Sequence, residues 1–326
     1  MKPLLSSPVA RIGVIRNPYS TLSRAHYGVS RAAALDSDIL IEQSRDTGDI
    51  AQILRHFRDN EIGIIVIDGG DGTVREVLSQ CPAVFAEDMP AFCVLPSGKT
   101  NVCAHDTGTA RYRRDAFHRL LERRKEGIGP DALRRRPVLG IEWEDAFHAP
   151  LHGMLLGFAG YREATSLAQS RVHSKGLNHR AAVAVTLISF FYSAIFGNDG
   201  NGIRAGEDMA ISYDGEAAIY GPRFGAIMTT LQSFVLGIWP FWNADSGAIS
   251  WLDIQAPPPR LLAAFAAVMR NRPAPWMHDA GYLSGSANSV TIETHKPFIL
   301  DGETFGPGPS GRLRIDSSMR VDFIAP

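Results

Sequence analysis

The 326-residue sequence has little of several features that would place it in a specialised class. Its three cysteines, Cys81, Cys93 and Cys103, are odd in number and lack metal-ligand spacing, which argues against a disulfide framework. The 33 basic and 34 acidic side chains nearly cancel, which argues against nucleic-acid binding through overall charge. The composition therefore indicates a globular protein with reduced thiols, as in a cytoplasm.

Long apolar runs are also missing, with one partial exception. Residues 181–197, "AAVAVTLISFFYSAIFG", are uncharged but shorter than the ~20 residues that cross a bilayer comfortably. Two interpretations stay open, a buried helix or a face that contacts membrane or acyl chain. The N-terminal stretch "MKPLLSSPVARIGVI" lacks the long apolar core of a secretion signal.

The first part of the sequence alternates short apolar runs with helical patterns. Strands are predicted at residues 11–18, 37–44, 62–68 and 91–98, and helices at 49–61 and 73–80. The strands are uniformly apolar, which is typical of strands covered on both faces. This rhythm predicts a doubly wound parallel sheet, an α/β nucleotide-binding domain over residues 1–135.

The remainder, residues 136–326, changes to short alternating strands separated by Gly and Pro turns. This pattern predicts an all-β, sandwich-like domain, with helices at 178–197 and 259–273, and a last strand free to pack back on the first domain. Residues 111–136 carry ten Lys or Arg against four Asp or Glu, with Gly and Pro near the centre of "ERRKEGIGPDALRRRP". We expect a linker there, whose charge reflects either a solvated face or attraction to anionic lipid.

One strand, "GIIVID", runs directly into Gly69-Gly70-Asp71-Gly72-Thr73 and then into a helical pattern. Such a turn places backbone amides around a pocket that accepts phosphate oxygens, and glycine allows the ligand to approach the backbone closely. A carboxylate at Asp71, beside phosphates, requires a metal ion or a hydroxyl group as its partner. For Thr73 a helix-capping role is the alternative.

The motif "GGDGTVREV" resembles the nucleotide-binding signature shared by diacylglycerol, sphingosine and ceramide kinases and, more distantly, by NAD kinases and phosphofructokinases. Three further motifs resemble those of the lipid kinases, in the same order. They are "RNPYS" at residues 16–20, "LPSGKTN" at 95–101 and "LDGETF" at 300–305. The chain is thereby identified as similar to the lipid kinases over nearly its whole length.

This resemblance implies an ATP-dependent kinase that transfers the γ-phosphate to a hydroxyl of a neutral lipid, with Mg²⁺ bridging the phosphates. Asp301 would be the catalytic base, with Asp71 as its rival, although Asp301-Gly302 alone also suits a plain hairpin turn. No metal ligand is assigned. The residues expected on the nucleotide side are Asn17, Ser44, Gly69, Gly70, Gly72, Thr73, Ser97, Gly98, Lys99, Thr100, Asn101, Arg180 and Glu303.

The sequence departs from the family pattern in ways that matter. Lys99 and Thr100 follow Gly98 where the family has Gly-Thr, and Tyr161 stands where sphingosine kinases have an acidic residue. The acceptor is therefore expected to be diacylglycerol, ceramide or another neutral lipid. Two other hypotheses stay open, a catalytically silent lipid- or nucleotide-binding protein on this scaffold and an NAD kinase-like enzyme.

The expected partners are a lipid substrate and a membrane surface, with no nucleic acid, and the oligomeric state, including a homodimer, is open. We expect a cytoplasmic protein that associates peripherally with the membrane.

Overall fold

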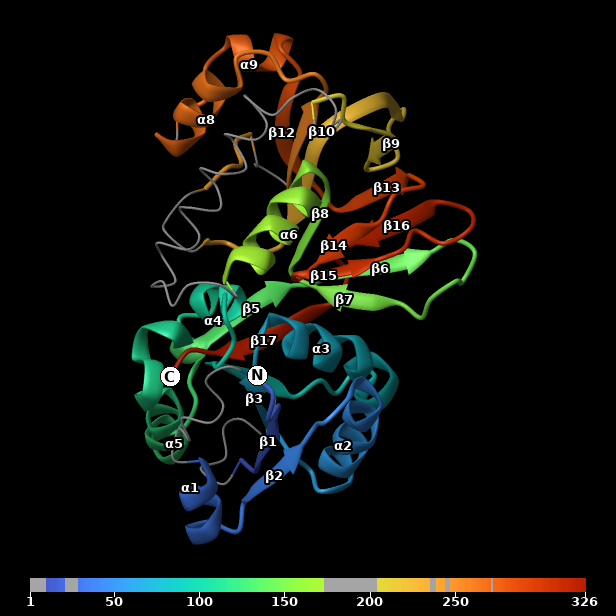
Figure 1. Cartoon of the computed structure of the whole chain (residues 1–326). Helices are drawn as coiled ribbons and strands as arrows, with labels where there is room; N and C mark the ends of the chain where they lie inside the picture. Colours follow the sequence, from blue (N-terminus) through green and yellow to red (C-terminus); the bar gives the residue numbers. More distant parts are fainter. Residues whose placement is uncertain (1–9, 21–28, 173–203, 235–238, 244–246, 271) are drawn as a thin grey trace. The chain divides into compact units, whose positions relative to one another are not determined.

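The structure is a computed structural model that describes residues 10–20, 29–172, 204–234, 239–243, 247–270 and 272–326 (Figure 1). The chain divides into two compact units. The first comprises Met1–Val138, Leu151–Gly153 and Met319–Pro326, and the second comprises Leu139–Pro150 and Met154–Ser318. The C-terminal segment therefore belongs to the same unit as the N-terminal half.

The first unit is built on a six-stranded sheet with the order β2-β1-β3-β4-β17-β5. The strands β1 to β4 are parallel, β17 joins β4 in parallel through Phe323 and Phe92, and β5 runs antiparallel to β17. The parallel α/β sheet expected from the sequence is confirmed. The strands are β1 (Ile12–Arg16), β2 (Ile39–Gln43), β3 (Ile64–Gly69), β4 (Ala91–Pro96), β5 (Leu133–Pro137) and β17 (Arg320–Ile324), with the short β7 (Leu151–Gly153) in the same unit.

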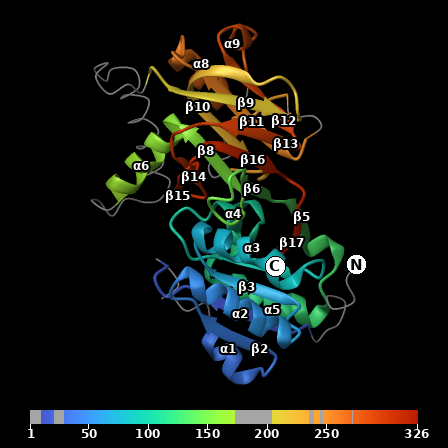
Figure 2. The same ribbon diagram turned by 90° about the vertical axis from the view of Figure 1, so that its right-hand side faces the viewer.

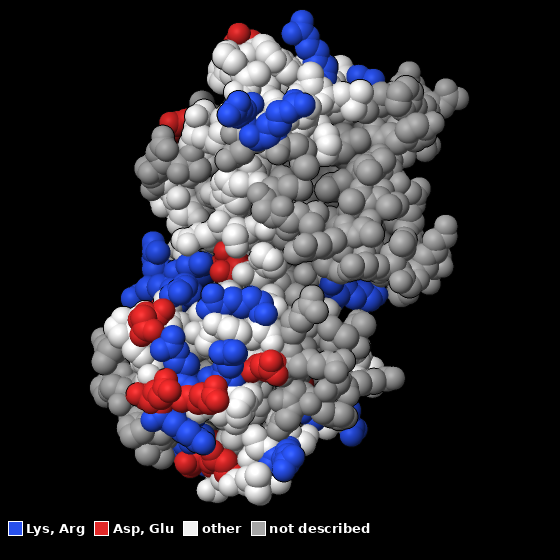
Figure 3. Space-filling model, turned by 90° about the vertical axis from the view of Figure 1, so that its left-hand side faces the viewer, with Lys and Arg blue, Asp and Glu red and all other residues white. Residues whose placement is uncertain are grey.

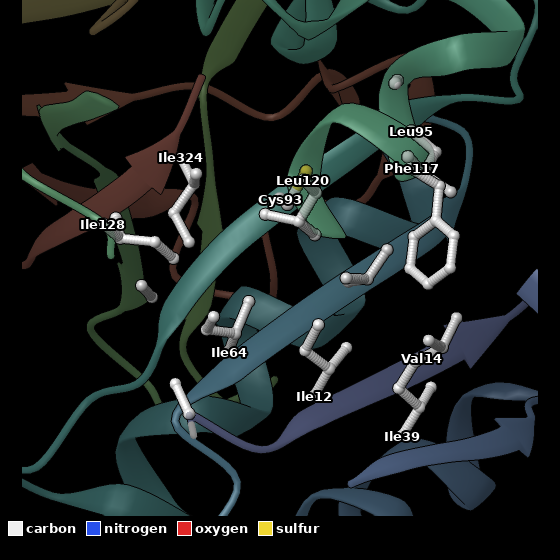
Figure 4. Packing of buried hydrophobic residues seen from close by; sticks show 14 of the residues in the cluster. Ile12, Val14, Ile39, Ile64, Cys93, Leu95, Phe117, Leu120, Ile128 and Ile324 are labelled. Carbon is white, nitrogen blue, oxygen red and sulfur yellow. The ribbon is translucent and has the colours of Figure 1, made fainter. Parts of the chain in front are cut away.

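Helices cover both faces of this sheet, because both faces of its strands are apolar. On one face Phe117 and Leu120 of α5 pack against Ile12, Ile64 and other strand residues (Figure 4). The opposite face carries α2 and α3, which also contact each other (Figure 2). The helices of this unit are α1 (Val29–Leu35), α2 (Thr47–Asp59), α3 (Asp71–Phe85), α4 (Val102–Asp106) and α5 (Ala116–Glu126), with 3₁₀ turns at Thr109–Asp115 and Pro130–Ala132.

The helix α2 shows how closely this layer packs. It begins after Asp46, whose carboxylate accepts a hydrogen bond from the amide of Asp49 (3.1 Å). Its Phe57 is fully buried, and a Cβ atom at Gly13 of β1 would lie 2.6 Å from the Phe57 ring. Glycine in β1 therefore lets this helix lie directly on the sheet.

The strand order creates a switch point between β1 and β3. The chain moves from β1 outward to β2 in one direction and from β3 to β4 in the other. Open α/β sheets bind ligands at the carboxyl ends of the strands at such a point. The loops that follow β1, β3 and β4 are therefore where a site is expected from topology alone.

The second unit is an antiparallel sheet, as expected. Its strands follow the order β15-β14-β8-β10-β9-β13-β16-β6, and β11 pairs with β10 and with β12. The helix α8 confirms the helix predicted within 259–273. The elements are β6 (Leu139–Trp143), β8 (Leu155–Ala159), α6 (Gly160–Val172), β9 (Glu207–Tyr213), β10 (Ile219–Thr229), β11 (Ile249–Gln255), α8 (Leu261–Met269), α9 (Trp276–Asp279), β12 (Tyr282–Ala287), β13 (Ser289–Glu293), β14 (Phe298–Leu300), β15 (Glu303–Phe305) and β16 (Arg312–Asp316).

The linker predicted within residues 111–136 is wrong. Residues 116–126 form α5, and 133–137 form β5, which is hydrogen-bonded to β17 at the edge of the first sheet. Composition misled because the Gly-Pro stretch is only a short turn between two elements of the same unit. The basic side chains also meet acidic partners: Arg136 Nε lies 2.7 Å from Asp106 Oδ2.

Two other predictions, the helix at 178–197 and the role of Arg180, fall outside the described residues. Of the helices that the structure does describe, none is long and apolar enough to cross a membrane.

Candidate functional site

The loops after β1, β3 and β4 meet at the switch point, where hydrogen bonds join their residues. Asn17, directly after β1, donates from Nδ2 to Thr73 Oγ1 at the start of α3 (3.0 Å), and its amide donates to the carbonyl of Asp68 (3.0 Å). Ser20 Oγ donates to the carbonyl of Ser97 after β4 (2.7 Å). The first loop thus joins both of the others.

Two glycines let the second and third loops approach each other. A Cβ atom added at Gly98 would lie 2.5 Å from the Cα of Gly70, and one added at Gly70 would lie 3.3 Å from the Cα of Gly98. A 2.5 Å separation is sterically forbidden for a real side chain. Gly98 therefore requires glycine, a Cβ atom at Gly70 would make a tight contact, and backbone rather than side chains brings the two loops together here.

The turn at residues 97–101 is held closed by Asn101. Its side chain accepts from the amide of Gly98 (2.7 Å) and donates to the carbonyl of Gly98 (2.8 Å). Asn101 has φ 55°, a left-handed conformation that Asn tolerates better than most residues. The turn is therefore a preformed loop, with Lys99 and Thr100 exposed at its tip.

Asp71 ties this turn to the glycine-rich loop. Its carboxylate accepts from the amides of Val102 (3.2 Å) and Cys103 (3.1 Å), which begin the short helix α4. The carboxylate thus satisfies amides that the helix itself leaves without acceptors. Asp71 orients the two loops relative to each other, a role that the sequence did not suggest.

The start of α3 belongs to the same group of loops. Gly70 is its N-cap and supplies no side-chain hydrogen bond, so the amides of Gly72 and Thr73 have no capping side chain and no acceptor within the helix. Helix N-termini carry partial positive charge and suit phosphate oxygens. Thr73 is not the N-cap, because it is the third residue of the helix, and its hydroxyl accepts from Asn17.

A buried chain of polar side chains beneath the loops was missed by sequence reasoning. Arg16 Nε donates to Asp68 Oδ2 (3.2 Å), and Ser97 Oγ donates to Asp68 Oδ1 (2.5 Å). Asp68 and Ser97 are fully buried, and the Arg16 side chain is 9% exposed. This network joins the ends of β1, β3 and β4. Arg16 and Asp68 are charged residues at the ends of strands that are otherwise apolar, and this charge was the signal that the sequence offered.

Ser44 lies at the end of β2, next to this network. Its amide donates to the carbonyl of Arg16 (2.9 Å) and its hydroxyl to the carbonyl of Asp46 (2.8 Å). The side chain is buried, so it shapes the loop after β2.

The remaining candidates, Asp301 and Glu303, lie in the second unit. Asp301 and Gly302 join β14 to β15 with φ values of 48° and 87°, the two left-handed positions of a type I′ turn. The Asp301 carboxylate accepts from the amides of Met154 (3.1 Å) and Leu155 (3.0 Å). The hairpin turn expected as the alternative is present, and the turn also holds a carboxylate in a defined orientation. Glu303 is exposed.

The structure thus brings together eleven nucleotide-side candidates and the catalytic candidate Asp71 in the first unit, twelve residues in all, and holds Asp301 and Glu303 in the second. The twelve are Asn17, Ser44, Gly69, Gly70, Asp71, Gly72, Thr73, Ser97, Gly98, Lys99, Thr100 and Asn101. Within the residues that the structure describes, no group of three or more His, Cys, Asp or Glu side chains is arranged to hold a metal ion.

Comparisons with known proteins concern the family and the fold. Residues 11–129 match the family model of the diacylglycerol kinase catalytic domain. A probable lipid kinase YegS of Escherichia coli strain 536 is 24% identical over 229 residues, covering 65% of this chain and 74% of the relative. The corresponding protein of Shigella flexneri is 23% identical over the same length. The crystal structure of a diacylglycerol kinase from Bacillus anthracis matches 97% of this chain and 96% of its own, with a TM-score of 0.59 and 15% identity, and thus shares the fold.

Proposed function

Because residues 11–129 match the family model of the diacylglycerol kinase catalytic domain, we propose that the protein belongs to this family and is an ATP-dependent lipid kinase that phosphorylates a hydroxyl of a neutral lipid. Diacylglycerol and ceramide are the acceptor types proposed. The observation that carries the proposal is the contact of backbone at Gly70 and Gly98, at the switch point where the topology alone predicts a ligand site.

On this proposal ATP is the phosphoryl donor, and the first unit binds it mainly through backbone. The amides at the start of α3 receive phosphate oxygens, and Asn17 and Asn101 hold the loops in the shape that these oxygens require. Lys99, exposed at the tip of its turn, supplies a mobile positive charge for the same phosphates. Such an arrangement serves phosphoryl transfer, in which positioning and charge stabilisation do most of the work.

The chemical step is proposed to use Asp301 as the general base. Its carboxylate removes the proton of the lipid hydroxyl, the oxygen attacks the γ-phosphorus, and the bond to the bridging oxygen breaks to release ADP. The amides of Met154 and Leu155 keep this carboxylate in one orientation. Asp71 is assigned to loop geometry, because its carboxylate joins the glycine-rich loop to the start of α4.

Kinases of this kind use Mg²⁺ to bridge the donor phosphates and neutralise their charge. The described residues provide no cluster of ligands for it, so we assign no protein ligand and no step to the ion.

The direct test is to incubate the purified protein with ATP and a panel of diacylglycerol, ceramide, sphingosine and monoacylglycerol, and to measure phospholipid formed. We expect phosphorylation of diacylglycerol or ceramide and none of sphingosine. ATP binding without any phospholipid would instead support the silent binding protein, and phosphorylation of NAD would support the NAD kinase-like enzyme. Either result would remove the proposed function.

A further inference from the structure

A lipid kinase meets its acceptor at a bilayer, and the basic run at residues 111–136 is the surface that the sequence offers for this contact. In the structure, several of these basic side chains form ion pairs with acidic side chains of the same unit. Arg124 pairs with Asp36 (2.8 Å) and Asp38 (3.2 Å), and Arg136 pairs with Asp106, with both arginine side chains at least nine-tenths buried. Figure 3 shows blue and red side chains interspersed over this unit. The run is therefore poorly suited to attract anionic lipid.

A different surface in the second unit has the opposite character. The helix α8, Leu261–Met269, has the sequence LLAAFAAVM, without a polar residue. Its inward face is seated in a small core, where Leu261 and Ala264 are buried with Met277 and Tyr282. The helix is thus fixed to the body of the unit.

The outward face of α8 is apolar as well. Leu262 is 57% exposed, and Ala263 is also exposed, with Ala266 partly exposed one turn further on. An ordinary surface helix places polar residues on this side. After the helix, Pro273, Pro275 and the partly exposed Trp276 extend the apolar surface. We call these six residues the α8 surface.

The charges around the α8 surface have one predominant sign. Residues 257–281 contain three arginines and one aspartate, three minus one giving +2 with histidine neutral. Arg260 lies 5.5 Å from the Trp276 ring centroid, and Arg270 and Arg272 are exposed with no carboxylate partner among the described residues. In Figure 3, blue side chains border a mostly white surface at the top, where Figure 1 shows α8.

We propose that the α8 surface docks onto an anionic membrane, with Leu262 and Trp276 entering the headgroup region and the arginines contacting lipid phosphates. Apolar side chains and tryptophan, bordered by arginine, are typical of protein surfaces that bind the headgroup region of a membrane. The nine-residue helix is too short to span a bilayer and lies in the interface plane. The inference rests on the proposed function, because a lipid kinase must reach a membrane to meet its substrate. Membrane binding itself is measured in an assay that requires no catalysis.

The test is cosedimentation of the full chain with vesicles of phosphatidylcholine, with and without phosphatidylglycerol, at low and at physiological salt. Wild type is expected to bind the anionic vesicles. Leu262→Gln is expected to lower the partition coefficient by about tenfold. Arg270→Gln with Arg272→Gln is expected to lower it by about 25-fold at low salt, and less at physiological salt.

Matched controls are available on the same chain. Leu35→Gln removes a leucine that is 81% exposed on α1, and Arg55→Gln with Arg314→Gln removes two exposed arginines elsewhere. These variants are expected to bind like wild type. If Leu262→Gln binds as well as Leu35→Gln does, or if wild type binds neither vesicle, the proposal is wrong.

The proposal would also be wrong if a second copy of the chain, or another part of the same chain, covered the α8 surface. A dimer in solution that Leu262→Gln converts to monomer would mark the surface as a contact between copies of the chain. A Leu262→Cys thiol that resists maleimide in the native protein would show that the chain itself covers the helix; Cys81, Cys93 and Cys103 are buried and give little background.

The kinase assay with a short-chain acceptor in solution separates this inference from the proposed function. We expect Leu262→Gln to keep wild-type turnover there. Absence of turnover in wild type would remove the proposed function and leave the vesicle result standing.

Discussion

At the scale of single residues, Gly98 shows why the candidate site depends on backbone. Its hydrogen leaves room for the Cα of Gly70, and its amide and carbonyl both bond to Asn101. A methyl group would have to displace one of two loops that are otherwise tied together. The arrangement of these two loops therefore depends on this position more than on the exposed Lys99 beside it.

We predict that Gly98→Ala weakens ATP binding by about 10- to 100-fold, because overpacking of this kind costs about 1–3 kcal/mol. Isothermal titration with ATP measures the change. Gly306→Ala is the control, since a Cβ atom there meets nothing within 4 Å. Equal affinity in both variants would show that the Gly70–Gly98 contact does not form the nucleotide site.

A second prediction at this scale concerns Asp301. Asp301→Asn is expected to lower kcat by about 10²–10⁴ with little change in ATP affinity, because the amide cannot accept the hydroxyl proton. Its stability is expected to fall by about 1 kcal/mol, since NH₂ replaces the oxygen that accepts from the Met154 amide, while the other oxygen still accepts from both the Met154 and Leu155 amides.

The control for this variant is Gly302→Ala, which strains the same turn at φ 87° and keeps the carboxylate. Comparison of kcat and melting temperature separates the two effects. If Gly302→Ala loses as much kcat as Asp301→Asn at similar stability, Asp301 acts only through the hairpin.

At the scale of elements, β5 is the clearest example of a strand that composition hides. Its sequence LRRRP reads as a solvated basic segment, yet it pairs with β17 along its whole length. Arg136 lies with its side chain 9% exposed against Asp106, whose side chain is fully buried, whereas the Arg135 side chain is 70% exposed. Neighbouring arginines in one strand therefore have different physical roles.

We predict that Arg136→Met destabilises the protein by about 3–5 kcal/mol, because it leaves the Asp106 carboxylate buried without its cation. Arg135→Met is expected to change the free energy of unfolding by about 0.5 kcal/mol or less. Urea unfolding of the two variants gives the comparison. A small effect of Arg136→Met would mean that other contacts of Asp106 compensate for the lost arginine.

At the scale of the whole molecule, the buried thiols link stability to alkaline pH. Burial raises the pKa of the Cys93 thiol to about 12 and raises the pKa of Cys81 as well. In the unfolded chain both thiols lose their protons near their ordinary pKa, so between that value and the raised one the folded state binds more protons than the unfolded state. Stability is therefore unaffected at neutral pH and falls as pH rises above about 9.

We predict that this fall contributes about 1.4 kcal/mol for each pH unit and each thiol. Urea unfolding from neutral to alkaline pH, compared between wild type and the variant Cys81→Ala with Cys93→Ala, isolates the thiols from tyrosine and lysine. The variant is expected to be less stable at neutral pH but to lose stability more slowly with pH. Parallel curves would contradict the assignment.

Some of the candidate site was readable from the sequence because short motifs carry their own geometry. The glycines at 69, 70 and 72 predicted a turn for phosphate, and Asn17 and Asn101 follow strands whose apolar pattern was plain. The Arg16–Asp68–Ser97 network could not be read, because its members are far apart in the chain and meet only when β1, β3 and β4 align. The structural contacts of Asp71 were hidden for the same reason.

The sequence by itself determined the local elements, the parallel order of the first half and the β character of the second, because hydrophobic periodicity and turn residues act over a few neighbours. Only the tertiary structure decided which partners distant residues take. It placed β17 between β4 and β5. It also paired Arg124 and Arg136 with aspartates, and it left the apolar outward face of α8 exposed. Pairing and burial depend on contacts across the whole chain, which no local pattern records.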